Sequence, residues 1–292
     1  MFLGILLACG VTKDSAEEKE RILDDTFKSY WYQGGAELNV YDLHQARYGE
    51  YRKGQAVMVF VTEPFQSEKL VKADQSSPKN KQVLKLNYLK KFSTGVYDYS
   101  MMLSDFFPLK SGAHALKVTA SSQEWCGHTF MQLENRKDFE IQLHSYFESE
   151  GEQDVKLKSL HLEDDVMNQI RVNPELLPQG DFEMLPSLFY MRLKHKEVKA
   201  YQANAELTSV SDTLQLYHLT YPREHRSLKV YFGKSFPHTI WSWEESYPES
   251  WTDDSNIMTS TATLTKQMRL PYWEHNKEKD SIYRRELGLP KL

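Results

Sequence analysis

Short stretches of alternating apolar and polar residues follow one another along almost the whole chain. In residues 139–144 every second residue is apolar, and residues 56–61 form a solid apolar run. A period of two residues is typical of a strand with one buried face. About a dozen such segments occur, spaced roughly 10–15 residues apart, with few helical patterns between them. The pattern therefore favours a mainly β fold of antiparallel strands, arranged as a sandwich or a barrel, and argues against a βαβ fold.

The composition agrees with a large β domain. The chain has 292 residues, of which 40% are hydrophobic, and it contains 17 tyrosines, 14 phenylalanines and 6 tryptophans. Aromatic residues favour strands and supply a large buried area. The formal net charge of −5 differs from the basic excess of nucleic-acid-binding proteins. We therefore expect no nucleic-acid partner.

Three segments depart from the strand pattern. Apolar residues recur at three- and four-residue steps over residues 16–32, which predicts an N-terminal helix. Residues 160–181 are either a short helical insertion or a seam between two halves of the domain. The third segment is the charged tail from Tyr272, which is expected to lie over the body. Strands resume after residue 181, and residues 188–193 are predicted to form one of them. We predict a single β-rich domain over residues 16–292.

The first residues contain a short motif that ends in a cysteine and a glycine. Residues 5–10 are Ile-Leu-Leu-Ala-Cys-Gly, which resembles the lipobox of bacterial lipoproteins. In that family the cysteine thiolate takes a diacylglycerol, and the signal peptide before it is removed. The resemblance implies that residues 1–8 are the remnant of a signal peptide. It also implies that Cys9 is lipidated and that residues 9–15 form a tether.

A complete signal peptide has a basic segment followed by about 7–15 apolar residues. Residues 1–8 contain no Lys or Arg, so we expect the true start to lie upstream. Two or three acyl chains, such as palmitate, would anchor the protein stably, because a single chain gives only marginal membrane binding. The implied location is the cell envelope, with the lipid in the outer membrane and the body facing the periplasm.

The body of the chain resembles an uncharacterised lipoprotein family of Gram-negative bacteria. The likeness covers most of residues 25–250 and is strongest in five segments: residues 30–32, 41–50, 60–65, 71–74 and 123–128. Members are sometimes labelled septum formation inhibitor Maf. Maf proteins are nucleotide pyrophosphatases with an α/β fold and an opening Leu-Ala-Ser-x-Ser-Pro-Arg-Arg string, which does not occur in this sequence. We therefore transfer no Maf activity to this chain.

A second likeness concerns the later part of the chain. Residues 180–190, the strands that follow and Ile240-Trp241 resemble β-rich periplasmic half-barrel proteins, some of which carry lipids or lipoproteins. That resemblance implies an antiparallel curved sheet, half-barrel or barrel-like, whose apolar concave face can hold an acyl chain. Such a mostly apolar cavity with few polar groups is the usual form of a small-molecule site.

Catalytic and metal-binding patterns are weak. Residues 125–128, Trp-Cys-Gly-His, begin like a thioredoxin-type site but lack the second cysteine that dithiol exchange requires. A metal site at Cys126 and His128 would need further ligands close by. Neither Gly-x-Ser-x-Gly nor His-Glu-x-x-His occurs in the sequence. We predict no catalytic residue, no metal and no cofactor.

Aromatic residues beside polar groups are the remaining candidates for binding. Trp125 and His128 lie close together, and Trp241 and Trp243 lie beside carboxylates at residues 244 and 245. Exposed rings beside carboxylates can form platforms for sugars, although such rings more often belong to a core. We assign these four residues as predicted ligand-binding residues.

These observations lead to a prediction of function. The chain is expected to be a non-enzymatic envelope lipoprotein that binds a hydrophobic ligand, such as a lipid or acyl chain, or an envelope partner protein. The alternative is a membrane-anchored hydrolase that acts on envelope glycan or lipid. The alternative predicts carboxylates or a Cys/His pair that converge in a cleft.

Overall fold

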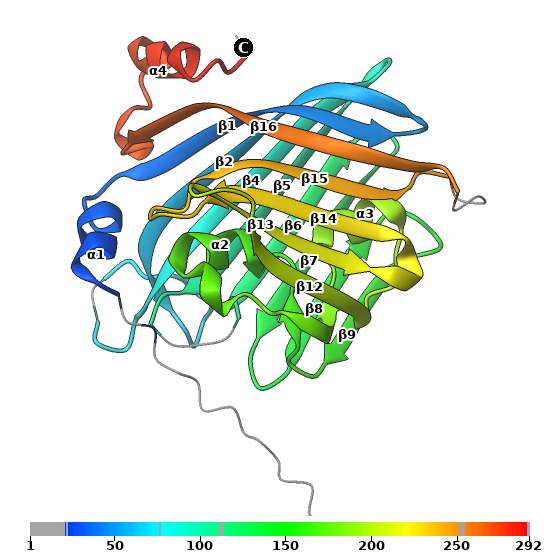
Figure 1. The fold of residues 1–292 in the computed structure, drawn as a ribbon, viewed down its shortest axis with the longest axis horizontal. Coiled ribbons are helices and arrows are strands. Elements are labelled where there is room, and N and C mark those ends of the chain that lie inside the picture. Colours follow the sequence, from blue (N-terminus) through cyan, green and yellow to red (C-terminus); the bar gives the residue numbers. More distant parts are fainter. Residues whose placement is uncertain (1–20, 22, 76, 111–113, 251–254, 291–292) are drawn as a thin grey trace, which may run out of the picture.

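The structure is a computed structural model, and it describes five parts of the chain: residues 21, 23–75, 77–110, 114–250 and 255–290. The predicted lipobox, Cys9 and the tether lie outside the described residues. The body is built from strands, with short helices at the two ends of the chain and between β10 and β12 (Figure 1).

Sixteen strands make up the sheet. They are β1 (Ala36–Arg47), β2 (Glu50–Gln66), β3 (Val71–Lys72), β4 (Lys81–Thr94), β5 (Tyr97–Pro108), β6 (Lys117–Glu124), β7 (Gly127–Asn135), β8 (Phe139–Ser145), β9 (Glu152–Leu157), β10 (His161–Leu162), β11 (Gly180–Leu185), β12 (Tyr201–Ser209), β13 (Leu214–Tyr221), β14 (Arg226–Gly233), β15 (Ile240–Pro248) and β16 (Ile257–Leu270). The helices are α1 (Asp25–Trp31), α2 (Asp165–Val172), η1 (Pro174–Leu176), α3 (Leu188–Lys194), η2 (Pro222–Glu224), η3 (Tyr272–Glu274), η4 (Glu278–Asp280) and α4 (Ser281–Glu286).

All sixteen strands belong to one continuous sheet. Their spatial order is β10-β11-β12-β13-β14-β15-β16-β1-β2-β4-β5-β6-β7-β8-β9, and β3 pairs with β2 outside this path. Every strand pair is antiparallel except β10 with β11. The sheet curves without closing, so that β12–β16 and β1 lie in front of β4–β9 (Figure 1). The structure confirms the predicted mainly β fold with an antiparallel, half-barrel-like sheet.

The alternating pattern of the sequence corresponds to the two faces of this sheet. In β8, Phe139, Ile141 and Leu143 are buried in the concave core, whereas Glu140 and Gln142 are exposed on the outer face. Side chains alternate between the two faces of a strand, so a two-residue period places every apolar residue of β8 inside.

Strand β1 alternates less clearly because both of its faces are covered. On the outer face, Leu287 from the C-terminal segment packs with Ala36, Leu38 and Val40 in a second apolar cluster. On the inner face, Tyr41 belongs to the main core. The C-terminal segment therefore lies over the body, as the sequence analysis predicts.

Two short helices fill the concave side of the sheet. All residues of α2 and all residues of α3 are buried, and both helices pack against β5 (Figure 1). The segment 160–181 supplies β10, α2 and η1, and the strands before and after it belong to the same sheet. This segment is thus a helical insertion within the concavity of one sheet.

The prediction of a strand over residues 188–193 is wrong, because these residues form α3. Ser187 caps the helix, since its hydroxyl accepts a hydrogen bond from the Phe189 amide at 3.2 Å. A helix that is buried on all sides has no polar face, so its sequence lacks the helical period. A short apolar run of this kind cannot be assigned to strand or helix by its period.

The N-terminal helix is shorter than predicted within the described residues. Helix α1 begins at Asp25, after Asp24 caps it by accepting a hydrogen bond from the Phe27 amide at 2.7 Å. Phe27 and Trp31 are buried against the main core. The helix therefore closes the end of the sheet from which β1 starts (Figure 1).

Buried ion pairs connect the helical insertion to the sheet. Arg171 of α2 donates two hydrogen bonds to Glu37 of β1, at 2.6 and 2.7 Å, and both side chains are fully buried. Burial raises the pKa of the Glu37 carboxyl, but the Arg171 guanidinium outweighs burial and lowers this pKa below its ordinary value. This bidentate pair fixes α2 in one orientation on the sheet.

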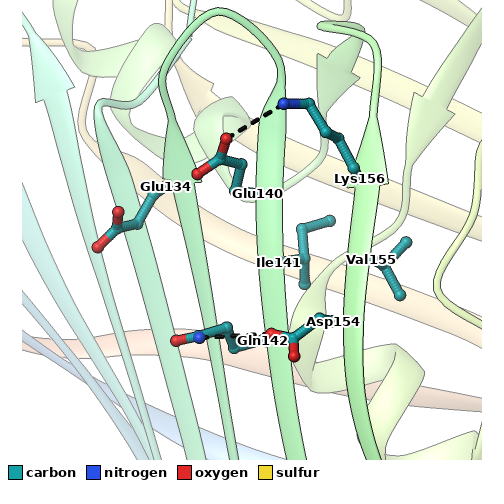
Figure 2. Close-up of a pocket in the computed structure, with 7 residues that line it drawn as sticks. All are labelled: Glu134, Glu140, Ile141, Gln142, Asp154, Val155 and Lys156. Atoms are coloured by element: carbon teal, nitrogen blue, oxygen red, sulfur yellow. Dashed lines mark hydrogen bonds and ion pairs between the residues drawn. The ribbon is translucent and has the colours of Figure 1, made fainter.

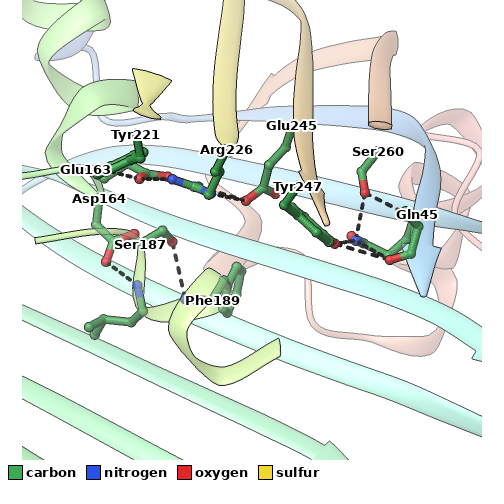
Figure 3. Close-up of polar contacts among 12 residues, drawn as sticks. Gln45, Glu163, Asp164, Ser187, Phe189, Tyr221, Arg226, Glu245, Tyr247 and Ser260 are labelled. Atoms are coloured by element: carbon green, nitrogen blue, oxygen red, sulfur yellow. Dashed lines mark hydrogen bonds and ion pairs between the residues drawn. The ribbon is translucent and has the colours of Figure 1, made fainter. Parts of the chain in front are cut away.

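A second buried cluster links both walls of the half-barrel (Figure 3). Arg226 of β14 contacts Glu163, which precedes α2, at 2.5 Å and Glu245 of β15 at 2.8 Å. Glu245 also pairs with Lys90 of β4 at 3.7 Å. The cluster thus joins the front wall, the back wall and the insertion through charged side chains.

Candidate functional site

Four hairpin turns lie at the same end of the sheet. They connect β1 to β2, β4 to β5, β6 to β7 and β8 to β9, and these eight strands are consecutive neighbours in antiparallel order. Each turn contains an aromatic side chain. We call Tyr48, Tyr97, Trp125 and Tyr146 the aromatic rim.

Three side chains of the aromatic rim are exposed, and the half-buried Tyr97 contacts Tyr48 and Trp125. Trp125 is 76% exposed and Tyr146 is 77% exposed, and Tyr48 is also exposed. The Tyr97 hydroxyl donates to the Tyr48 hydroxyl at 3.3 Å. The Tyr97 ring stacks on Trp125 with 6.3 Å between centroids and an interplanar angle of 29°. The rings therefore form a preorganised surface at the turns.

Arg47 attaches Tyr48 to the interior of the protein. Its guanidinium lies 4.3 Å from the centroid of the Tyr48 ring, donates to the Tyr99 hydroxyl at 3.1 Å and donates to the Leu193 carbonyl at 2.6 Å. Burial raises the pKa of Tyr48, but hydrogen bonds from Tyr97 and Tyr99 and the nearby Arg47 charge outweigh burial and lower it. Hydrogen bonding to Tyr48 raises the pKa of Tyr97 to about 12.

Gly127 makes room for the last ring of the aromatic rim. A Cβ atom at this position would lie 3.0 Å from Cδ1 of Tyr146 and 3.2 Å from its Cβ. Tyr146 therefore packs directly on the backbone at Gly127. Side-chain contacts connect Tyr48, Tyr97 and Trp125, and this backbone contact connects Tyr146 to the β6–β7 hairpin.

A chain of polar contacts supports the turns beneath Trp125. The buried side chain of Glu124 accepts hydrogen bonds from Arg192 at 3.2 Å and from the Cys126 amide at 2.5 Å. Arg192 contacts His195 at 3.3 Å, and the His195 imidazole contacts Glu150 at 2.5 Å. These contacts tie α3 to the β6–β7 and β8–β9 turns.

Glu150 is also hydrogen-bonded by Ser145. Burial raises the pKa of the Glu150 carboxyl, but the hydrogen bonds from His195 and Ser145 outweigh burial and lower it. The carboxylate lies between the hydroxyl and the imidazole. In a hydrolytic triad the imidazole lies between the other two groups, so that it can take the proton of the hydroxyl. This arrangement supports the turn and does not activate Ser145.

The turns have acidic residues and no basic ones. Residues 48–51, 95–98, 123–128 and 146–152 contain neither Lys nor Arg. The six acidic residues in them are Glu50, Asp98, Glu124, Glu148, Glu150 and Glu152. The neighbouring Arg52 pairs with Glu50 at 2.5 Å.

The structure separates the four predicted ligand-binding residues. Trp125 belongs to the aromatic rim, and His128 is exposed three residues further on, opposite Gln123 in the β6–β7 hairpin. Trp241 is 49% exposed, but it lies at the start of β15, at the end remote from the four turns. Trp243 is 2% exposed and packs on the rings of Tyr41 and Tyr88 in the core.

The sequence analysis did not single out Tyr48, Tyr97 or Tyr146. A shared signal exists, because each of the four turns combines an aromatic residue with a glycine, namely Gly49, Gly95, Gly127 and Gly151. Glycine is ordinary in a hairpin turn, whereas a large aromatic side chain is not. Repeated exposed rings at turns therefore indicate a binding surface.

The outer face of the sheet has a separate hollow of about 430 Å³ (Figure 2). It is lined by Glu134, Glu140, Ile141, Gln142, Asp154, Val155 and Lys156. Its charges are already paired, since Lys156 contacts Glu140 at 3.3 Å and Gln142 contacts Asp154 at 3.4 Å. This polar, open hollow does not suit an acyl chain.

The concave face offers little space within the described part of the chain. The gap between α3 and β5–β7 is lined by apolar residues such as Met101, Met131 and Phe189, and it leaves no room for a water molecule. The interior expected for an acyl chain is occupied by α2 and α3. The exposed surface at the four turns is thus the better candidate for binding.

Neither a scan against protein-family models nor a search of curated proteins matched the chain. Within the residues that the structure describes, no group of three or more His, Cys, Asp or Glu side chains is placed to bind a metal ion. None of the helices in the described ranges has the length and apolar character needed to span a bilayer.

Proposed function

We propose that this chain is a lipid-anchored binding protein of the cell envelope, without enzymatic activity, that contacts its partner through the aromatic rim. The observation that supports this most is the row of four rings at turns of one sheet, of which Tyr48, Trp125 and Tyr146 are exposed and Tyr97 is half-buried. Exposed contiguous aromatic surface is unusual on a protein that binds nothing.

The direction of the chain supports the same proposal. Strand β1 runs from the end covered by α1 to the aromatic rim. The backbone amide of Arg21, near the start of the described chain, bonds to the Lys110 carbonyl in the β5–β6 connection, which is also at the end remote from the rim. A lipid on Cys9 would therefore be attached to the opposite end of the body and leave the aromatic rim accessible.

The filled interior favours surface binding over carriage of an acyl chain. Buried ion pairs attach α2 to the sheet, and removing one partner of such a pair is strongly unfavourable. An acyl chain could enter only after α2 or α3 moved. The alternative of a hydrolase is less supported, because the Ser145–Glu150–His195 order is unsuited to a nucleophile.

The anchor is tested by replacing its cysteine. We expect Cys9→Ser to abolish incorporation of labelled palmitate and to move the protein from the membrane fraction to the soluble fraction, when it is expressed with its upstream sequence in a Gram-negative host. Cys126→Ser is the matched control, because it changes the chain's second cysteine, and it should leave both readouts unchanged. Labelled, membrane-bound Cys9→Ser protein would contradict the proposed anchor.

The binding surface is tested by photo-crosslinking in cells. A photoreactive amino acid at position 146, in the aromatic rim, should give a discrete crosslinked product in the envelope. The same amino acid at position 210 should give none, because Val210 is exposed in the β12–β13 turn at the other end of the sheet. Equal products at both positions, or none at position 146, would rule out the aromatic rim as the contact surface.

A further inference from the structure

We propose that the aromatic rim binds an uncharged, β-linked glycan chain that lies along the row of turns. This inference rests on the proposed function and names the chemical class of the partner. It follows from the shape of the rim, from its charge and from the polar groups beside the rings.

The shape of the aromatic rim suits a chain-like ligand. The four turns belong to eight neighbouring strands, so successive turns are about 10 Å apart, twice the spacing of adjacent strands. The row is long in this direction and about one ring wide. An extended β-linked glycan presents the same sugar face at every second residue, with a repeat comparable to the spacing of these turns. A glycan with a helical, α-linked backbone would leave the straight row.

The chemistry of the rings suits a sugar. The flat face of a pyranose has C–H groups that pack on aromatic rings, and Trp125 has one face free because the other lies over Tyr97. Polar groups surround the rings. They are the tyrosine hydroxyls and the exposed side chains of Gln123 and His128. Carboxylates accept hydrogen bonds only, and sugar hydroxyls donate them, so the exposed carboxylates of Asp98, Glu148 and Glu152 complement a hydroxyl-rich ligand.

The charge of the turns argues against a lipid surface. Anionic membrane surfaces attract segments rich in Lys and Arg, whereas residues 48–51, 95–98, 123–128 and 146–152 contain only acidic charges. The same repulsion disfavours an anionic polysaccharide. An uncharged glycan has no such penalty.

The composition of the turns argues against a globular protein partner. A standard interface buries about 800 Å² on each partner around a packed apolar centre. Val96 is the only aliphatic apolar residue in the four turns, and acidic residues alternate with the rings. A narrow row of rings between carboxylates lacks that centre.

Binding of defined oligosaccharides to the full chain tests the proposal. Calorimetry and tryptophan fluorescence would compare cellohexaose and N-acetylchitohexaose, which are β-linked, with the α-linked maltohexaose. We expect a β-linked hexamer to bind more tightly than its dimer, since the three two-residue repeats of a hexamer reach across all four turns, whereas a dimer spans about one turn spacing. Trp125→Ala should weaken this binding at least about tenfold, equivalent to about 1.4 kcal/mol.

Trp241→Ala provides the matched control, because it removes a half-exposed tryptophan at the start of β15, away from the aromatic rim. Its affinity should stay within about twofold of the parent, a difference of less than about 0.5 kcal/mol. Gly127→Ala should also weaken binding, since its Cβ displaces Tyr146, and circular dichroism would verify that each variant is folded. Equal losses for Trp125→Ala and Trp241→Ala would overturn the proposal.

Two outcomes separate this inference from the proposed function. If position 146 crosslinks in cells but no β-linked hexamer binds, the binding function stands and the glycan assignment fails. If the protein instead co-sediments with phosphatidylethanolamine–phosphatidylglycerol vesicles through Trp125, the partner is a lipid surface and the glycan assignment is likewise overturned. If neither crosslinking nor any binding occurs, both proposals fail.

Discussion

Replacing Arg226 with methionine should destabilise the protein by about 3–5 kcal/mol, the cost of leaving buried charges without their partner. Arg226 is 2% exposed and donates to Glu163 at 2.6 Å and to Glu245 at 2.8 Å. Burial raises the pKa of the Glu245 carboxyl, but Arg226 and then Lys90 outweigh burial and lower it. Without the guanidinium, the carboxylates of Glu163 and Glu245 remain buried, and Lys90 pairs with Glu245.

Urea unfolding at neutral pH would measure the effect, with the slope of the transition compared to verify that unfolding remains two-state. The control is Lys156→Met, which removes an exposed ion pair with Glu140 and should leave the free energy of unfolding nearly unchanged, because exposed ion pairs contribute little. Arg226→Lys should recover only part of the loss, because an ammonium cannot make the bidentate contact. A loss below about 1 kcal/mol for Arg226→Met would mean that the cluster does not bind the walls together.

The position of these charges explains why the strands of the sheet can be predicted from the sequence, whereas the packing of the interior cannot. Strands such as β8 have one exposed face, so their two-residue period is visible without any knowledge of neighbours. Glu37, Arg171 and Arg226 face the interior, where an apolar residue is the ordinary expectation. Each is tolerated only because a partner from a distant part of the chain neutralises it, and that pairing is invisible in the local pattern.

The aromatic rim also depends on contacts between distant parts of the chain, which the local sequence pattern does not reveal. Trp125 could be predicted as a binding residue from its own segment, since a tryptophan in a short polar turn is unusual. Its neighbours Tyr48, Tyr97 and Tyr146 come from turns up to 98 positions apart in the numbering, and their proximity depends on the order of the strands. Trp243, like Trp125, lies beside polar residues in the sequence, but it is buried. Its side chain is on the inner face of β15, where it packs on Tyr41 and Tyr88.

Asp105 is a buried acid. Unlike Glu37 and Glu245, it is not paired with an arginine among the residues that the structure describes. It lies on β5 with 0% exposure, and neither carboxylate oxygen has a well-formed hydrogen bond to any residue that the structure describes. Asn168 of α2 faces it, and its side-chain atoms likewise have no well-formed hydrogen bond. Burial raises the pKa of Asp105 well above its ordinary value, and the charges of Asp165 and Asp164 raise it further.

Asp105→Asn should therefore stabilise the protein increasingly as the pH rises from 5 to 8. The unfolded chain loses the Asp105 proton near pH 4, whereas the folded protein retains it to a higher pH, so in this interval folding takes up a proton. Stability then falls by as much as about 1.4 kcal/mol for each pH unit, and asparagine removes this loss because it does not ionise. Urea unfolding of both proteins across this range would measure the difference, with Asp212→Asn in the exposed β12–β13 turn as the control. A constant difference between Asp105→Asn and the parent would show that Asp105 ionises as easily in the folded protein as in the unfolded chain, and that the contact between β5 and α2 accommodates a charge.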